Sequence, residues 1–225
     1  MQLYVAIFDA NGVLLNPEPY KKYLMGKEQK LFRKNGIKLT SAQISTAWKS
    51  VSKGMGFGPG ALLGVRLRFF EKLGIPKDIL PEYEKIDREA FRHYGLMEPT
   101  ERNVLRKIKT LGLYLTVLTD TVHTTTDKRL MLDSAGLGGM FDGIFVPNDT
   151  GHRKPDPEAY KAVLESFKAE PENAIFISHE KDEIDGAKLL GIKTISYRER
   201  IKSADYIAES FDDIFHIIKD LKRQQ

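Results

Sequence analysis

The sequence predicts an α/β protein: a doubly wound parallel sheet of the Rossmann-like kind, with an all-helical segment inserted after its first strand. The first observation is a set of short apolar runs rich in β-branched and aromatic residues, at 3–8, 113–119, 143–146, 173–178 and 193–197. Such runs are typical of strands buried on both faces of a parallel sheet. The second observation is that helical patterns separate the later runs, which predicts βαβ units. The chain of 225 residues is 41% hydrophobic and 29% charged, which indicates a globular protein.

Composition and charge exclude several classes of function. The formal net charge is only +4, from 35 basic and 31 acidic residues, which is too balanced to predict nucleic-acid binding. The absence of cysteine excludes disulfides and thiol catalysis. No apolar run reaches the roughly 18 residues that span a bilayer, and the first residues lack a signal pattern. We expect a cytoplasmic protein without nucleic-acid or membrane partners, and the sequence does not indicate its oligomeric state.

The first strand ends in a candidate catalytic residue. The stretch VAIFDANGVLLN, residues 5–16, is apolar up to Asp9 and turns at Gly12. Open α/β folds bind their ligands at the carboxyl ends of the strands, so Asp9 lies where chemistry is expected. A carboxylate there can act as a nucleophile. The alternative is an aspartate that only stabilises the turn.

Residues 17–96 form the inserted helical segment. They contain four stretches of helical periodicity and no convincing strand, at 19–36, 41–54, 61–74 and 81–95. Ser41 is predicted to be the N-cap of the second helix. We expect this segment to be a cap that closes over a substrate and excludes water, while residues 1–16 and 97–225 form the sheet domain. The glycine-rich run 53–64 follows a helix rather than a strand, so it should line the entrance rather than bind phosphate.

The later strands bring further polar residues to the same edge of the sheet. Thr119 and Asp120 end the second strand, and Lys154 lies in a loop just before a helix. An acidic loop follows the strand that ends at Ser178. The helices of this half of the chain are predicted at 124–137, 155–170 and 181–191.

In order, spacing and placement, these pieces resemble the motifs of the haloacid dehalogenase superfamily, whose members are mostly phosphatases. The resemblance covers nearly the whole chain, including a helical cap after the first motif. It implies that Asp9 is a nucleophile that forms a covalent intermediate. It also implies that Thr119 binds the transferred group through its hydroxyl, beside Asp120 and Ser178. Lys154 would offset the carboxylates and bind the anion, although a solvated surface lysine is the simpler alternative.

Two positions of the first motif depart from the family pattern. Asn11 stands where phosphatases of the family carry an aspartate that protonates the leaving group, and an amide has no such proton to give. Substrates with acidic leaving groups, such as acyl or aryl phosphates, are therefore expected to react far faster than alkyl phosphates. Val13 replaces a usual threonine, so a supporting hydroxyl is missing.

The fourth motif is altered where the family binds magnesium. Ser178 and His179 replace the usual glycine–aspartate pair, and Glu183 replaces a later aspartate. Mg²⁺ prefers carboxylate and water oxygens, so a histidine here weakens the metal site. The expected metal ligands are Asp9, the backbone carbonyl of Asn11, Glu180 and Glu183.

The acidic loop has other interpretations. Acids in the first turn of a helix are favoured by the helix dipole, and this is the preferred reading of Asp182 and Asp185. For Glu180 and Glu183 this alternative and the metal role both stay open. His179 could be a base, a ligand of a softer metal, or a replacement without a role.

We predict a hydrolase of the phosphatase type with an aspartate nucleophile, acting on a small phosphorylated metabolite with altered acid–base and metal chemistry. Two alternatives stay open. The altered motifs also fit a catalytically impaired protein that keeps the pocket for binding. The family's 2-haloacid dehalogenases work without metal, lack the second aspartate, and often carry residues like Ser178 and Tyr160 at these positions. Against that reading, the carboxylate of Asp120 would repel a carboxylate substrate.

Overall fold

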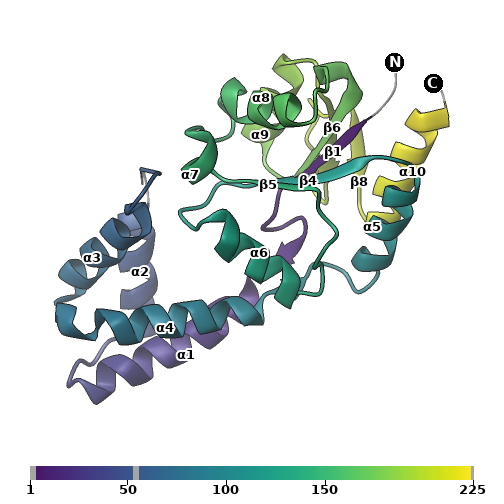
Figure 1. The fold of residues 1–225 in the computed structure, drawn as a ribbon. Coiled ribbons are helices and arrows are strands. Elements are labelled where there is room, and N and C mark those ends of the chain that lie inside the picture. Colours follow the sequence, from purple (N-terminus) through teal and green to yellow (C-terminus); the bar gives the residue numbers. More distant parts are fainter. Residues whose placement is uncertain (1–3, 53–55, 224–225) are drawn as a thin grey trace.

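The computed structural model describes residues 4–52 and 56–223 (Figure 1). Its centre is a six-stranded sheet in the order β5–β4–β1–β6–β7–β8, in which every neighbouring pair is parallel. The strands are β1 (Val5–Phe8), β4 (Tyr114–Leu118), β5 (Gly143–Phe145), β6 (Ala174–Ser178), β7 (Lys193–Tyr197) and β8 (Tyr206–Ala208). The predicted α/β fold with a doubly wound parallel sheet is confirmed.

Helices cover both faces of the sheet. One face carries α5 (Glu101–Thr110), α6 (Thr125–Ser134) and α10 (Phe211–Arg223), and the other carries α8 (Pro157–Ser166) and α9 (Lys181–Leu189). The short elements α7 (Pro147–Thr150) and η3 (Pro171–Asn173) lie in connections. Side chains of β1 alternate between the faces: Phe8 packs with the first group of helices and Ile7 with the second. Both are fully buried, which explains why this strand is continuously apolar.

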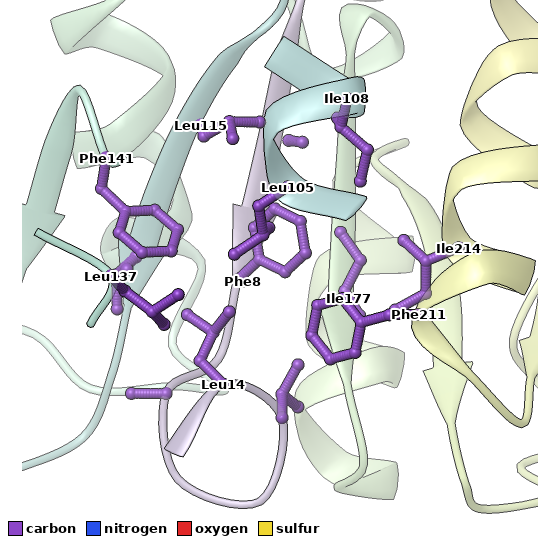
Figure 2. Close-up of a cluster of buried hydrophobic side chains, with 14 of the residues drawn as sticks. Phe8, Leu14, Leu105, Ile108, Leu115, Leu137, Phe141, Ile177, Phe211 and Ile214 are labelled. Atoms are coloured by element: carbon purple, nitrogen blue, oxygen red, sulfur yellow. The ribbon is translucent and has the colours of Figure 1, made fainter. Parts of the chain in front are cut away.

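The larger core cluster fixes the strand that delivers Asp9. Figure 2 shows Phe8 and Ile177, from β1 and β6, beside Leu105 of α5 and Phe211 of α10. All four side chains are fully buried. Truncating a buried phenylalanine to alanine costs about 3–5 kcal/mol, so this packing holds the end of β1 firmly in place.

The helical segment has a core of its own. Its helices are α1 (Glu18–Lys34), α2 (Ser41–Ser52), α3 (Ala61–Leu73) and α4 (Leu80–Ala90), with the turns η1 (Lys77–Ile79) and η2 (Phe91–His93). They pack around a cluster that includes Phe32, Phe69, Phe70 and Tyr83. An antiparallel pair, β2 (Leu15–Asn16) with β3 (Gly95–Leu96), joins the segment to the sheet. The division into a cap of residues 17–96 and a sheet domain stays a prediction.

Some local predictions need correction. Thr40, not Ser41, caps α2: the Gln43 N–H donates to Thr40 Oγ1 at 3.2 Å, and Gln43 Oε1 accepts from the Thr40 N–H at 2.9 Å. This reciprocal pair is a capping box. The sequence patterns also did not predict α5, α10 or the short strand β8. Residue 3 of the first predicted strand and residues 53–55 of the glycine-rich run lie outside the described residues. Within residues 4–52 and 56–223, no helix combines the length and apolarity needed to cross a membrane.

Candidate active site

The polar residues singled out in the sequence meet at the carboxyl ends of β1, β4 and β6. Asp9 follows β1 directly, Thr119 and Asp120 follow β4, and the loop before α8 contributes Lys154. The strand order reverses between β1 and β6, and open α/β sheets bind ligands at such a point. The residues line one cavity of about 430 Å³, together with Asn11, Pro155, His179, Glu180, Asp182 and Glu183.

Lys154 is shared by two carboxylates of the cavity. Its Nζ lies 2.7 Å from Asp9 Oδ1 and 2.8 Å from Glu183 Oε1, and its side chain is fully buried. Burial alone lowers the pKa of a lysine, but the carboxylates of Asp9 and Glu183 outweigh it, so the pKa of Lys154 is raised. The lysine therefore stays charged, and the alternative of a solvated surface lysine is wrong.

Burial and charge also act on the neighbouring acids. Burial raises the pKa of Asp120, an effect that Lys154 opposes and Asp9 reinforces. The same three influences act on Glu183, and the net result again is a raised pKa. The Asp120 side chain is held in place because its Oδ1 accepts the backbone N–H of Lys154 at 3.2 Å.

Glu183 is held from three sides. Besides the ion pair with Lys154, its Oε2 accepts the Ser178 hydroxyl at 2.5 Å. The Tyr160 hydroxyl donates to its backbone carbonyl at 2.7 Å. Ser178 is fully buried and also accepts the backbone N–H of Glu180 at 3.2 Å. The Ser178 hydroxyl is thus engaged with Glu183, which it positions, and its role in substrate binding stays a prediction.

Asn11 and His179 carry polar atoms without partners. Asn11 Oδ1 and His179 Nδ1 are buried and have no hydrogen-bond partner among the described residues. His179 Nδ1 lies 3.8 Å from Asp9 Oδ2, and its Nε2 lies 3.7 Å from Glu180 Oε1. One nitrogen of the imidazole ring therefore faces the free oxygen of Asp9, and the other faces Glu180.

A magnesium ion, which the resemblance implies, does not fit these residues as they are arranged. Mg²⁺ demands nearly octahedral oxygen ligands at about 2.0–2.1 Å. Both carboxylate oxygens of Glu183 and one of Asp9 are already engaged, and His179 stands beside the remaining oxygen of Asp9. In the part of the chain that the structure describes, no three histidine, cysteine, aspartate or glutamate side chains are arranged to hold a metal ion. The arrangement therefore disfavours the predicted ligand set of Asp9, Asn11, Glu180 and Glu183.

Comparison with known proteins identifies the family. A family model described as haloacid dehalogenase-like hydrolase matches residues 5–191. The chain belongs to this family. The predicted family is thereby confirmed, and so is the prediction of a hydrolase at the level of the family. The match includes every candidate site residue named above.

Several relatives and solved structures are similar to the chain. The pyrophosphatase PpaX of Bacillus velezensis is 29% identical over 148 residues, which is 62% of this chain and 68% of the relative. The pyrophosphatase PpaX of Halalkalibacterium halodurans is 24% identical over 221 residues, 93% of this chain and 90% of the relative. A HAD phosphatase from Thermococcus onnurineus has a TM-score of 0.73 at 20% identity, covering 96% of this chain and 97% of its own. The L-2-haloacid dehalogenase PA0810 has a TM-score of 0.73 at 18% identity, covering 97% and 99%. These structures share the fold.

Lys128 is a residue of the site region that the sequence analysis missed. It lies on α6 and is only 1% exposed. Among the described residues its ammonium group forms no ion pair or hydrogen bond, and it lies 6.0 Å from the centroid of the Tyr94 ring. Burial lowers its pKa to about 8, an effect that Asp9 opposes and Lys154 reinforces. Lys128 thus places a second buried amine within electrostatic reach of Asp9. The available signal was a lysine on the same helical face as Met131 and Leu132.

The helical segment touches the sheet part close to the site. The Gly58 N–H donates to Asn148 Oδ1 at 2.7 Å, and the Arg153 guanidinium lies 5.5 Å from the Phe57 ring centroid. In Figure 1 the turn before α3 accordingly approaches α7. Because Arg153 immediately precedes Lys154, the glycine-rich run contacts the loop that carries the buried lysine.

Proposed function

We propose that the chain hydrolyses small phosphorylated metabolites with Asp9 as the nucleophile. The observation that carries the proposal is the buried ion pair between Asp9 Oδ1 and Lys154 Nζ, which are 2.7 Å apart. Both residues line the cavity, and so does Thr119. An ion pair on one oxygen fixes the direction of the carboxylate and leaves the other oxygen for attack. The name pyrophosphatase, which the relatives carry, supports a phosphorylated substrate.

The proposed reaction has two steps. Asp9 Oδ2 attacks phosphorus, the bond from phosphorus to the leaving oxygen breaks, and the leaving group departs with the electron pair of that bond. The Lys154 ammonium and the Thr119 hydroxyl hold the phosphoryl oxygens during the transfer. Water then attacks the phosphorus of the aspartyl phosphate, and the bond between phosphorus and Asp9 Oδ2 breaks. Its electron pair returns to the Asp9 carboxylate, and both protons of the water leave with the phosphate. Phosphatases of the family generally use Mg²⁺, whereas the two steps proposed for this chain use Asp9, Lys154, Thr119 and water.

Asn11 narrows the class of substrate. Because its amide has no proton to give the leaving group, the leaving group must be stable as an anion. Acyl phosphates and aryl phosphates meet this condition. Pyrophosphate meets it too, since its leaving group is phosphate, and this agrees with the name of the relatives.

We further propose that residues 17–96 act as a cap over the cavity. The contacts of Gly58 with Asn148 and of Phe57 with Arg153 support a closed arrangement. A closed cap excludes water from the first step and strengthens the electrostatic interactions around Lys154.

The test is turnover by purified protein, with Asp9→Asn as the matched control. Acetyl phosphate, p-nitrophenyl phosphate and pyrophosphate should release phosphate, and the control should release none. Glycerol phosphate should react slower by at least about 100-fold, the typical contribution of a general acid. Phosphate release that is unchanged in Asp9→Asn would overturn the proposal. Halide release from 2-chloropropionate would favour the dehalogenase alternative, and phosphate binding without any turnover would favour the binding protein.

A further inference from the structure

His179 fills the space between the loops that follow β1 and β6. Its ring lies against Gly12, where an added Cβ would come within 2.7 Å of His179 Cε1. Gly12 also has a φ of +83°, a left-handed conformation that other residues rarely adopt. Because glycine has no side chain, the His179 imidazole can pack directly against the backbone at this position.

The ring nitrogens of His179 face two carboxylates without bonding to them. The distances of 3.8 Å to Asp9 Oδ2 and 3.7 Å to Glu180 Oε1 are too long for hydrogen bonds. Nδ1 is nevertheless buried, with no hydrogen-bond partner among residues 4–52 and 56–223. Buried polar atoms without a partner are rare in proteins. Nδ1 lies beside the oxygen that attacks in the proposed reaction, and because the His179 side chain as a whole is 31% exposed, the rest of its ring is open to a bound substrate.

The charge of the cavity favours a further hydrogen-bond donor besides Lys154 and the Thr119 hydroxyl. The described lining carries five carboxylate side chains against one lysine, Lys154. That lysine is already shared by Asp9 Oδ1 and Glu183 Oε1. A phosphoryl group that approaches Asp9 Oδ2 is anionic, so it is repelled unless a hydrogen-bond donor also faces this oxygen. His179 has a ring nitrogen 3.8 Å from Asp9 Oδ2.

We propose that His179 takes the place of a divalent cation in this site. A ring N–H of His179 holds the phosphoryl oxygen nearest Asp9 Oδ2, and hydrolysis proceeds without a metal. This inference rests on the proposed function and adds no covalent step to it. The fourth motif of this chain is then a hydrogen-bonding site, in which Ser178 orients Glu183 and His179 binds the substrate.

Three substitutions of His179 test the inference by turnover of acetyl phosphate, in EDTA and in Mg²⁺. The unmodified protein should react equally fast in both. His179→Ala should lower kcat by about 100-fold in both, the usual effect of removing one oxyanion donor. His179→Gln keeps an N–H donor and should retain more activity than His179→Ala. Equal losses in these two variants would indicate a structural role and overturn the inference.

The third substitution, His179→Asp, exchanges the donor for a metal ligand and has a readout independent of turnover. Isothermal titration calorimetry with Mg²⁺ should show binding to this variant and none to the unmodified protein, and Mg²⁺ should raise the activity of the variant only. Mg²⁺ binding to the unmodified protein, or activity that EDTA removes and Mg²⁺ restores, would overturn the inference. If no phosphorylated substrate reacts at all, the proposed function fails, while the calorimetry still decides whether His179 excludes the ion.

Discussion

Replacing the buried Lys128 by methionine should stabilise the protein at neutral pH. Lys128 is fully enclosed on α6, and its pKa is lowered to about 8 from the ordinary 10.5. Burial is the main cause, because the nearby carboxylate of Asp9 only partly compensates for the loss of water. Methionine has a similar length and no charge, so it should occupy the same space without this cost.

The size of the effect follows from the two pKa values. A decrease from 10.5 to about 8 means that the fold disfavours the charged amine by about 3 kcal/mol, at about 1.4 kcal/mol for each tenfold change in proton affinity. Below pH 8 the folded and unfolded chains both hold the proton, and the whole cost applies. Between pH 8 and 10.5 the unfolded chain binds more protons, so the free energy of unfolding rises with pH. The variant should therefore be more stable by about 3 kcal/mol at pH 7, and this gain should shrink towards pH 10.

Urea unfolding of both proteins at pH 7, 8.5 and 10 measures the difference directly. Substitution of an exposed lysine, Lys38→Met, is the matched control and should show no pH-dependent gain. The reasoning is refuted if Lys128→Met has the same gain at all three values of pH. It is also refuted if this variant is less stable than the unmodified protein at pH 7.

Three further predictions concern the site and the helical segment. Asn11→Asp restores a carboxylic acid and should raise kcat/KM for alkyl phosphates by about 100-fold or more while changing acyl phosphates little; equal changes in a parallel assay of both classes would contradict this. Lys154→Met leaves the carboxylates of Asp9 and Glu183 uncompensated, and urea unfolding should show a loss of about 3–5 kcal/mol at pH 7; a loss below about 1 kcal/mol would show that the ion pair is not buried as described. Burial raises the pKa of Glu28 to about 7 from 4.5, because the fold favours the protonated carboxyl. The stability that this protonated carboxyl contributes is fully present below pH 4.5 and is lost as pH rises through 7. Glu28→Gln should thus stabilise by about 3 kcal/mol at pH 8 and little at pH 4.5, and a gain of the same size at both pH values would argue against it.

The sequence was sufficient to predict the sheet and the residues around its carboxyl edge. Asp9, Thr119 and Lys154 could be placed together because each follows a short apolar run or precedes a helix, and parallel strands end at one edge. These signals are local in the sequence, so they can be recognised without knowledge of how the side chains pack. The strand β8 was missed because it has three residues at the edge of the sheet, too few for a periodic pattern.

Other features depend on contacts that sequence patterns do not contain. Lys128 shares a helical face with Met131 and Leu132, but a lysine in a helix is ordinarily solvated, so its burial is established by the packing of α6 against the rest of the protein. The engagement of Glu183 in α9 joins it to Lys154, from the loop before α8, and to Ser178, at the end of β6. His179 was recognised as a departure from the family pattern, but its place against Gly12 depends on how the loops after β1 and β6 meet.

The central claim is that Asp9 carries the phosphoryl group between the two steps. The most direct measurement is an acid quench of the protein during its first turnover of ³²P-labelled acetyl phosphate, followed by peptide mapping. The account predicts acid-stable label on the peptide that contains Asp9, and neither label nor phosphate release in Asp9→Asn. Label on a different peptide, or phosphate release that persists in Asp9→Asn, would contradict it.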